Sequence, residues 1–356
     1  MSDLKRTVLY QAHLDAGATM VDFGGWDMQS PDGIVAEHLY CRRHCGIFDV
    51  SHMGRIDVEG RDMVAFLQHV LSSNVLALDL NQAQYCIIPD VNGYAIDDAY
   101  LYRFEEGRYF LVVNAGNIEK DWAHLTAEAK NFDVRLTNVS AEYAAIAVQG
   151  PESKKILMTL AGGRQLTTEN VKNALNTLTM EGRPVRIAKT GYTGEPIGYE
   201  LYCRSEDARY FWDRLIELGA RPTGLGARDT TRMEASLPLY GHEMGECEMG
   251  GEIPIYAVPL AKFAVSFAPE KGDFIGREPL RKQFEAFKKI MNRDYSSIED
   301  LPYRIQPIYL EGKGVLRKGF PIYCKDAWAE GKQIGYVTSG TMIPYYKTRG
   351  EGLETV

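Results

Sequence analysis

The sequence contains no long hydrophobic run. No stretch approaches the about 20 consecutive apolar residues that a membrane-spanning helix needs. Residues 1–20 also lack the apolar segment of a secretory signal peptide. We therefore expect a cytoplasmic protein that does not act at a membrane.

Clustered positive charge is also absent. The chain has 40 Lys and Arg residues against 48 Asp and Glu residues, which gives a net charge of −8. Binding to a phosphate backbone needs Lys and Arg gathered in a patch or a run, so we expect no nucleic-acid partner.

Cysteine is scarce and scattered, which favours reduced thiols over a disulfide framework. The six cysteines are Cys41, Cys45, Cys86, Cys203, Cys247 and Cys324. Only the first two are closely spaced, near His38 and His44. No second pair at metal-ligand spacing follows, so we expect no metal site.

The short glycine motifs of several enzyme classes are missing. The sequence has no nucleophile elbow, no P-loop and no G-x-G-x-x-G fingerprint. Gly224-Leu225-Gly226 lacks the third glycine at the required spacing, which argues against a dinucleotide site.

What the sequence does contain indicates a protein of two or three domains, because 356 residues exceed the usual size of one domain. Hydrophobic periodicity predicts helices and strands that alternate up to about residue 260, as in mixed α/β domains. The helices are expected at 33–44, 62–71, 117–130 and 207–218, and the strands at 46–50, 55–58, 85–88, 144–148, 185–189 and 199–203. A β-rich region is expected after Ala261, with strands at 263–267, 305–310, 320–324 and 333–337 and a surface helix and loop over 284–302.

A β-hairpin at residues 91–114 has the clearest local signal. Ala99–Phe104 and Arg108–Val113 are rich in aromatic and aliphatic residues, and the segment 105–107 supplies a polar turn with glycine. Asp97 and Asp98 at its start must point to opposite faces. Either both cap the preceding turn, or Asp97 faces a site where it handles a proton or a cationic group.

Four further segments could carry chemistry. His52 could be a general base, although a lone histidine is more often structural. Glu200, inside an aromatic strand, either faces solvent or accepts paired hydrogen bonds from a ligand edge such as that of a pterin. Arg228 either belongs to a solvated charged face or pairs with a carboxylate. The fourth segment, 238–243, combines aromatic, imidazole and carboxylate groups.

These segments, in this order, resemble the glycine-cleavage T-protein (aminomethyltransferase) family over nearly the whole chain. The matching pieces are FGGWDM (23–28), GIVAEH (33–38), GIFDVSHMG (46–54), IDD (96–98), LVVNAGNIEKD (111–121), VQGP (148–151), TGYTGE (190–195), GYELY (198–202), GLGARDTTRMEASLPLYGHE (224–243), GDFIGRE (272–278) and GYVTSGT (335–341).

The resemblance implies an α+β fold, a three-domain cloverleaf around a central folate site. Two related mixed α/β modules, 1–140 and 141–260, would be followed by a small β-barrel-like domain, 261–356. The family normally continues past the position of Val356, so we expect a shortened or divergent member.

The resemblance also implies tetrahydrofolate as the ligand and a role for each matching residue. Asp97 would be the catalytic aspartate, Glu200 would bind the pterin and Arg228 would lie at the folate site. The pocket would further be lined by Tyr85, Met53, Asn114 and Tyr192.

The implied reaction takes an aminomethyl group from the dihydrolipoyl arm of a carrier protein. The N5 nitrogen of tetrahydrofolate attacks its methylene, ammonia leaves, and closure onto N10 gives 5,10-methylene-tetrahydrofolate. Residues 244–256 depart from the family pattern, which favours a different donor. A tetrahydrofolate-dependent methyltransferase or demethylase with a small methylated donor, and a non-catalytic folate-binding assembly protein, are therefore the alternatives.

Overall fold

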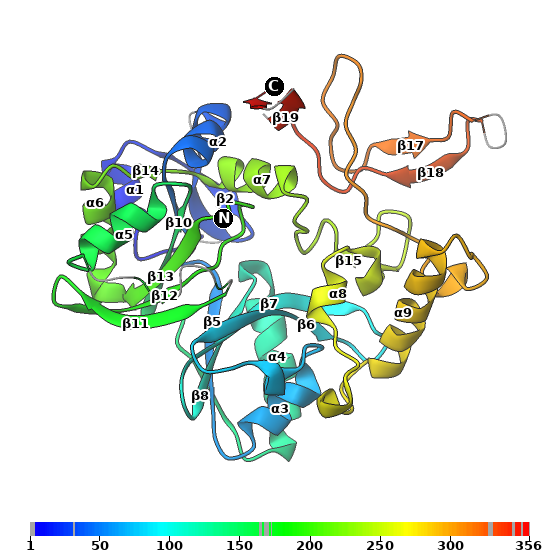
Figure 1. Cartoon of the computed structure of the whole chain (residues 1–356), viewed down its shortest axis with the longest axis horizontal. Coiled ribbons are helices and arrows are strands. Elements are labelled where there is room, and N and C mark those ends of the chain that lie inside the picture. The colour runs from blue at the N-terminus through cyan, green and yellow to red at the C-terminus, as the bar shows by residue number, and fades with distance from the viewer. Residues whose placement is uncertain are drawn as a thin grey trace.

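Two β-sheets packed face to face form the centre of the protein. The computed structural model describes residues 4–30, 33–163, 166, 171, 173–326, 330–343, 346–349 and 352–355. Figure 1 shows the six-stranded sheet beside α5 and α6 and the five-stranded sheet beside α3 and α4, with the C-terminal part of the chain lying to one side of both.

The six-stranded sheet is antiparallel except for one short parallel edge strand, β14, which pairs with β4. Its order is β11 (Leu175–Met180), β12 (Arg183–Ala188), β13 (Gly198–Arg204), β10 (Tyr143–Gln149), β4 (Gly46–Asp49) and β14 (Arg221–Pro222).

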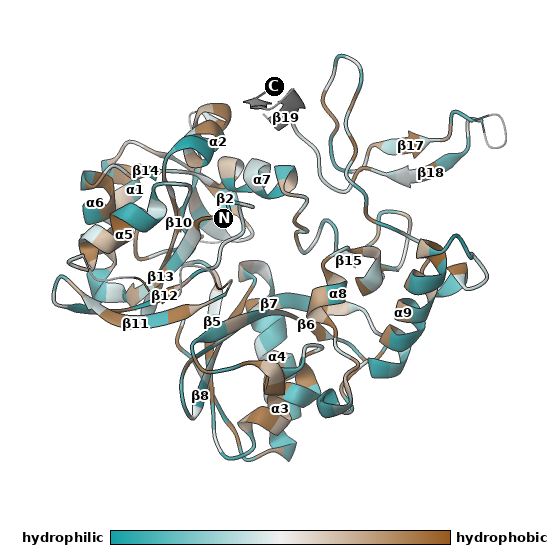
Figure 2. Ribbon diagram, in the orientation of Figure 1, coloured by the Kyte–Doolittle hydropathy of each residue, from teal (hydrophilic) through white to brown (hydrophobic). Residues whose placement is uncertain are grey.

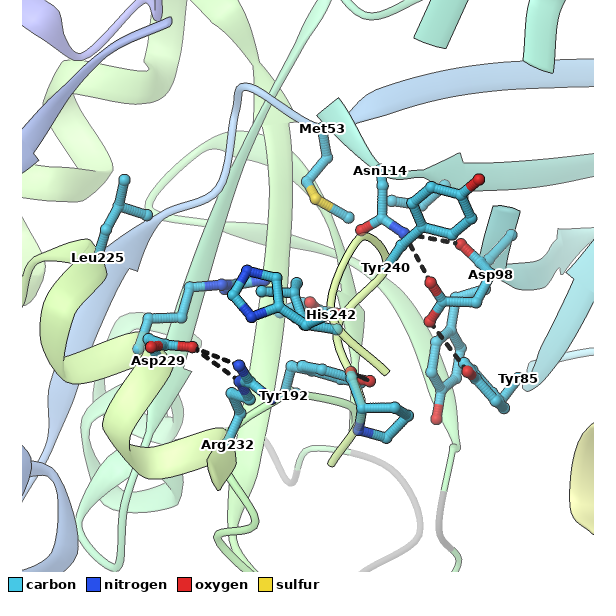
Figure 3. A pocket seen from close by; sticks show the side chains of 18 of the residues that line it. Met53, Tyr85, Asp98, Asn114, Tyr192, Leu225, Asp229, Arg232, Tyr240 and His242 are labelled. Carbon is cyan, nitrogen blue, oxygen red and sulfur yellow. Dashed lines mark hydrogen bonds and ion pairs between the residues drawn. The ribbon is translucent and has the colours of Figure 1, made fainter. Parts of the chain in front are cut away.

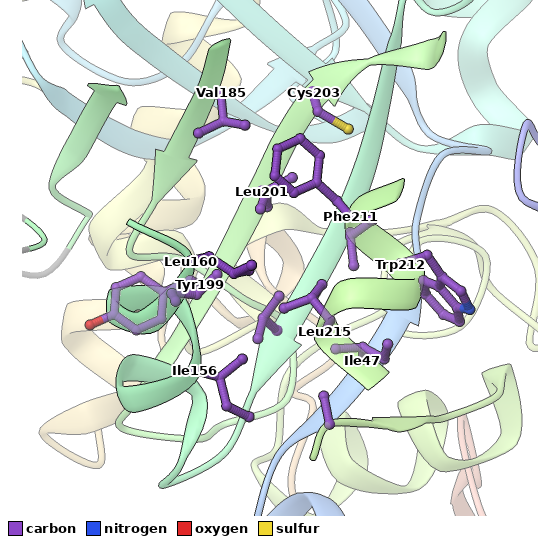
Figure 4. Packing of buried hydrophobic residues seen from close by; sticks show 14 of the residues in the cluster. Ile47, Ile156, Leu160, Val185, Tyr199, Leu201, Cys203, Phe211, Trp212 and Leu215 are labelled. Carbon is purple, nitrogen blue, oxygen red and sulfur yellow. The ribbon is translucent and has the colours of Figure 1, made fainter. Parts of the chain in front are cut away.

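Three helices contribute to the core on one face of this sheet: α1 (Tyr10–Asp15), α5 (Ser153–Leu160) and α6 (Ala208–Glu217). Leu160, Leu201, Phe211 and Trp212 are fully or almost fully buried there (Figure 4). The apolar residues of α6 recur at helical spacing, so the helix has one hydrophobic side and one charged side (Figure 2).

The five-stranded sheet is antiparallel and contains the predicted hairpin. Its order is β6 (Gln82–Pro89), β7 (Ala95–Glu105), β8 (Arg108–Val113), β5 (Gly54–Glu59) and β9 (Arg135–Asn138). Leu101 of β7 lies opposite Leu111 of β8, which confirms the hairpin. Helices α3 (Met63–Val70) and α4 (Ile118–Glu128) supply apolar residues to the core of this sheet.

The other faces of the two sheets meet through aromatic side chains. The rings of Tyr102 on β7 and Tyr202 on β13 are 5.7 Å apart, and those of Phe110 and Tyr202 are 5.3 Å apart. The chain passes from one sheet to the other between β4 and β5, so residues 50–53 lie at the junction.

The N-terminal region adds a small sheet of β1 (Lys5–Arg6), β2 (Thr19–Phe23) and β3 (Trp26–Ser30), followed by α2 (Ile34–Arg43). The predicted helices at 33–44, 62–71, 117–130 and 207–218 are confirmed as α2, α3, α4 and α6. The domain boundaries at 140 and 260 stay predictions. Strand β4 precedes residue 140, although the five other strands of its sheet follow it.

The C-terminal part differs from expectation. It contains α7 (Leu225–Glu234), β15 (Gly245–Glu246), β16 (Glu252–Ile253), α8 (Ala261–Ala264), α9 (Arg277–Met291), β17 (Pro321–Tyr323), β18 (Gln333–Tyr336), β19 (Tyr346–Arg349) and β20 (Gly352–Thr355). The strand predicted at 263–267 is wrong, because 261–264 is helical. A short apolar run does not distinguish a strand from a buried helical turn.

Two further C-terminal predictions need correction. Residues 305–310 form no strand, and the helix expected within 284–302 instead spans Arg277–Met291. The predicted strands at 320–324 and 333–337 are present and pair as β17–β18. In the described residues after 300, the sheets are two-stranded and no closed barrel forms.

Candidate active site

A cavity of about 350 Å³ lies where the two sheets and α7 meet (Figure 3). Each wall comes from a different part of the chain: Met53 from the crossing between the sheets, Tyr85 and Asp98 from the five-stranded sheet, Glu200 from the six-stranded sheet, and Arg228 from α7. The volume falls within the range of roughly 300–1,000 Å³ typical of small-molecule sites.

Asp98 is the carboxylate of the hairpin that faces this cavity. Figure 3 shows it between Tyr85, whose hydroxyl donates to Oδ2 at 2.9 Å, and Asn114, whose Nδ2 donates to Oδ1 at 2.7 Å. Burial, and then the neighbouring Asp97 charge, raise the pKa of Asp98 to about 7. Asp98 can therefore gain or lose a proton near neutral pH.

Asp97 points the other way, and the expectation that it faces the site is corrected here. It is 0% exposed and is not among the residues that line the cavity. Its carboxylate accepts hydrogen bonds from the Asn114 backbone N–H (2.9 Å), Asn114 Nδ2 (2.9 Å) and Asn117 Nδ2 (2.5 Å). Alternation along β7 sends adjacent side chains to opposite faces, and the face towards the cavity is that of Asp98.

Glu200 lines the cavity with one oxygen firmly held. Its Oε2 accepts hydrogen bonds from Tyr102 Oη at 2.8 Å and Thr190 Oγ1 at 2.5 Å, with Tyr202 Oη at 3.3 Å. Within the described part of the chain, Oε1 has no hydrogen-bond partner. The side chain is thus fixed in place while one acceptor stays available to a ligand.

Arg228 supplies a cation that no described residue neutralises by direct contact. Its guanidinium lines the cavity, whereas the neighbouring Arg232 forms ion pairs with Asp229 (2.7 Å) and Glu243 (2.9 Å). Burial lowers the pKa of Arg228, and the charge of Glu200 opposes that shift. An arginine in this position is available to bind an acceptor or anionic group of a ligand.

The loop at 190–194 brings Tyr192 to the cavity. Gln149 anchors this loop, since its Nε2 donates to the carbonyls of Thr190 (3.1 Å) and Tyr199 (2.9 Å), and its Oε1 accepts from Thr193 Oγ1 at 2.7 Å. A Cβ at Gly191 would lie 2.1 Å from Gln149 Oε1, so a larger residue there would displace the amide that anchors the loop.

The crossing between the sheets holds Met53 against the cavity. The buried Arg55 donates from Nη1 to the Met53 carbonyl at 2.7 Å and from Nη2 to the Ser51 carbonyl at 3.0 Å. His52 is buried beside the rings of Phe23 and Trp26 and does not line the cavity. Burial lowers the pKa of His52 to about 3, so this histidine is neutral and structural.

Residues 238–242 form the remaining wall. His242 Nδ1 lies 2.9 Å from Ser339 Oγ, and Lys120 Nζ donates to the Tyr240 hydroxyl at 2.7 Å. The segment expected to reshape the donor side, 244–256, does not line the cavity. Its apolar side chains join another core cluster, so its unusual sequence does not bear directly on the site.

The cysteines and histidines near α2 have other partners. His38 lies 2.9 Å from Thr230 Oγ1 and 3.1 Å from Glu234 Oε2, and His44 lies 3.4 Å from Glu152. The buried Cys41 Sγ contacts the Gln149 carbonyl. In the residues that the structure describes, no group of three or more His, Cys, Asp or Glu side chains could hold a metal ion.

No helix in the described part of the chain is long and apolar enough to cross a membrane.

Comparison with known proteins identifies the family. The GCVT N-terminal domain family matches residues 9–251. The chain is 40% identical over 346 residues to an aminomethyltransferase of Deinococcus deserti, covering 96% of this chain and 86% of that protein. It is also 40% identical over 342 residues to an aminomethyltransferase of Thermus thermophilus, with 96% and 88% covered. The chain belongs to the aminomethyltransferase family, the T proteins of the glycine cleavage system.

A solved structure supports the fold of this aminomethyltransferase. Glycine cleavage system aminomethyltransferase T from Bartonella henselae superposes with a TM-score of 0.75 at 30% identity, covering 94% of this chain and 85% of that one. The expected mixed α and β fold is thereby confirmed. The family makes the protein an enzyme, a tetrahydrofolate-dependent transferase.

The chemical groups on the cavity walls suit a folate ligand. Glu200, with an oxygen that no described residue occupies, and Arg228, with no ion pair to a described residue, line the same space, together with Tyr85, Tyr100 and Tyr192. A pterin offers adjacent N–H donors for the carboxylate and a flat surface for the rings. Donors, acceptors and apolar area are therefore all present for this ligand.

Most of the expected pocket residues lie together. Glu200, Arg228, Tyr85, Met53, Asn114 and Tyr192 all line the cavity. The lining residues that were not assigned to the site include Asp98, Phe23, Tyr100, Tyr102, Leu225, Arg232, Tyr240 and His242. Three of them, Arg232, Tyr240 and His242, lie in segments that the sequence had marked for possible chemistry. Phe23, Asp98 and Leu225 lie in the matching family motifs, whereas Tyr100 and Tyr102 had only their place on the predicted strand as a signal.

Proposed function

We propose that this aminomethyltransferase moves the methylene of an aminomethyl group from the dihydrolipoyl arm of a carrier protein to tetrahydrofolate, which releases ammonia and leaves the dihydrolipoyl thiol free. One observation carries the assignment of roles within the site. A buried carboxylate with a pKa near neutrality, Asp98, faces the same cavity as the free oxygen of Glu200 and the unpaired Arg228.

Asp98 is the catalytic residue in this proposal, in place of Asp97. Bound tetrahydrofolate supplies the nitrogens that accept the one-carbon unit. In its ionised form, Asp98 stabilises positive charge that develops near the transferred carbon and accepts a proton at Oδ1 or Oδ2. Tyr85 and Asn114 hold both oxygens, so the carboxylate is already oriented when the reaction starts.

Glu200 and Arg228 bind and orient the ligand. Three hydroxyl groups fix Glu200 Oε2, and Oε1 is left for a pterin N–H. Arg228 provides donors for an acceptor on the ligand, and Met53, Asn114 and Tyr192 complete the walls. The apolar part of these walls keeps water from the reacting groups, which strengthens the electrostatic effect of Asp98.

The protein partner follows from the donor. A lipoyl arm must reach the cavity from outside, so a lipoyl-carrying protein is the proposed partner. The cytoplasm remains the predicted location.

Ammonia release tests the proposal. The protein is mixed with an aminomethylated lipoyl carrier, and ammonia is followed with and without tetrahydrofolate. We expect fast release only when both are present. Release at the same rate without folate, or none with both substrates, would contradict the proposed transfer.

A further inference from the structure

Behind Asp98, on the side of β7 away from the cavity, lie two more buried carboxyl groups. Asp97 on β7 meets Asp121 on α4, and both are 0% exposed. Asp97 is the neighbour that acts most strongly on the Asp121 carboxyl group, through its charge and through a hydrogen bond that can form only when one of the two groups holds a proton. Neither oxygen of Asp121 accepts a hydrogen bond from an N–H or hydroxyl of any described residue.

Such a pair cannot consist of two carboxylate anions. Ionised carboxylates only accept hydrogen bonds, so two of them share a hydrogen bond only if one holds a proton. Asp97 accepts three N–H groups from Asn114 and Asn117, whereas Asp121 accepts none. The charge is therefore stabilised on Asp97, and the proton belongs on Asp121.

The pair is connected to Asp98 through one amide. Asn114 Nδ2 donates to Asp97 Oδ1 at 2.9 Å and to Asp98 Oδ1 at 2.7 Å, and the Asn114 backbone N–H donates to Asp97 Oδ2. The position of Asn114 therefore depends on Asp97 being an acceptor at both of its oxygens. Any change in Asp97 is transmitted to the oxygen of Asp98 that faces Asn114.

We propose that Asp121 is a buried neutral carboxylic acid that donates its hydrogen to Asp97, and that this acid pair is a positioning device for the catalytic carboxylate of Asp98. The positioning role rests on the proposed function. The protonation of Asp121 does not, because it follows from the hydrogen-bond partners alone.

The surrounding charges agree with this arrangement. Burial, and then Asp97, raise the pKa of Asp121 to about 10, with Lys120 as an opposing cation. For Asp98, burial acts first and Asp97 second, while its hydrogen bonds with Tyr85 and Asn114 lower the pKa. The other titratable neighbours, Tyr192 and Cys86, have pKa values raised by burial and are neutral.

Carbon-detected NMR of protein labelled at the aspartate carboxyl groups tests the protonation directly. Asp121→Asn identifies the Asp121 signal, and Asp98→Asn that of Asp98. We expect the Asp121 carboxyl to stay protonated through neutral pH. An Asp121 signal that is already ionised at about pH 7 would overturn the inference.

The same titration tests the link to Asp98. Asp97→Asn removes a negative neighbour, so the midpoint of Asp98 should move to lower pH, and the acid limb of kcat/KM should move with it. Asp57→Asn is the matched control, because Asp57 is also a buried strand aspartate of this sheet, ion-paired with Arg108 and absent from the cavity wall. An unmoved Asp98 midpoint in Asp97→Asn would refute the coupling.

Two substitutions of Asp121 separate a hydrogen-bond donor from mere space filling. Asp121→Ala removes the donor to Asp97 and should lower kcat about tenfold or more. Asp121→Asn keeps an N–H donor and should recover most of that loss. Equal losses in both variants would contradict the positioning role.

Failure of this inference can be told from failure of the proposed function. The NMR titrations need no substrate. A protonated Asp121 in a protein that releases no ammonia would refute only the function. An ionised Asp121 in an active transferase would refute only the inference.

Discussion

Replacing Asp98 by asparagine should lower turnover strongly and stabilise the protein. The substitution is nearly isosteric, and its hydrogen bonds can persist. The new carbonyl can accept from Asn114 Nδ2, and the new amide can donate to the Tyr85 hydroxyl, which both donates and accepts. Folding and the shape of the cavity should therefore be kept.

The kinetic effect follows from the loss of a group that can hold charge and a proton. A positioned acid or base contributes about 10²–10⁴-fold, so we expect kcat to fall by that factor. Because the rest of the cavity is unchanged, tetrahydrofolate affinity should stay within about tenfold. Turnover is measured from folate product in single-turnover mixtures, and affinity by calorimetry.

The stability effect has a defined sign. The folded-state pKa of Asp98 is raised from 3.8 to about 7, so the folded protein binds this proton more tightly than the unfolded chain. In the wild type, stability from this group is fully present below about pH 4 and is lost as pH rises to about 7. A shift of about three pKa units corresponds to at most about 4 kcal/mol.

We therefore expect Asp98→Asn to be more stable than the wild type by on the order of 1–3 kcal/mol at about pH 8, with little difference near pH 4. Thermal unfolding at both pH values measures this. Turnover within threefold of the wild type would refute the catalytic assignment. A variant less stable at pH 8 would refute the reasoning about the buried charge.

Three other substitutions test folate binding and the anchoring of the loop that carries Tyr192. Glu200→Ala should weaken tetrahydrofolate binding by about tenfold or more, because a charged acceptor is worth about 1.5–3 kcal/mol; unchanged affinity by calorimetry would contradict the role. Arg228→Met should raise the folate Kd, whereas Arg221→Met, on an edge strand away from the cavity, should not. Gln149→Ala should release the loop that carries Tyr192 and lower thermal stability by about 1–3 kcal/mol, since three buried partners of the amide lose their hydrogen bonds; an unchanged unfolding temperature would show that the loop is held otherwise.

The pH dependence of kcat/KM reflects the pKa values of the free enzyme, so its acid limb should show the pKa of Asp98. Activity should fall as pH drops through about 7, because the carboxylate then takes up a proton. The limb should be absent from the residual activity of Asp98→Asn. A limb that persists there would belong to another group.

Sequence patterns located most of the site but not the orientation of one side chain. Alternation placed Asp97 and Asp98 on opposite faces of the hairpin. It could not say which face meets the cavity, because β7 is covered on both sides, by α3 and α4 on one and by the second sheet on the other. Both faces are apolar, so hydrophobicity does not distinguish them.

Elements with strong periodicity were predicted well, and short irregular ones were not. The helix α4 and the hairpin β7–β8 have complete local signals. Segments such as 261–264 and 305–310 contain too few residues for periodicity to decide between helix, strand and loop. The lining tyrosines Tyr100 and Tyr102 could not be assigned, because their role comes from packing between two sheets that are distant in sequence.

The identity of the folate product tests the account most directly. A lipoyl carrier with an isotope-labelled aminomethyl carbon, and separately a panel of small methylated donors, would be incubated with the protein and tetrahydrofolate, and the folates would be analysed by mass. We expect labelled 5,10-methylene-tetrahydrofolate from the carrier with the wild type, and at least about a hundredfold less with Asp98→Asn. A 5-methyl product from a small donor, with no transfer from the carrier, would contradict the account.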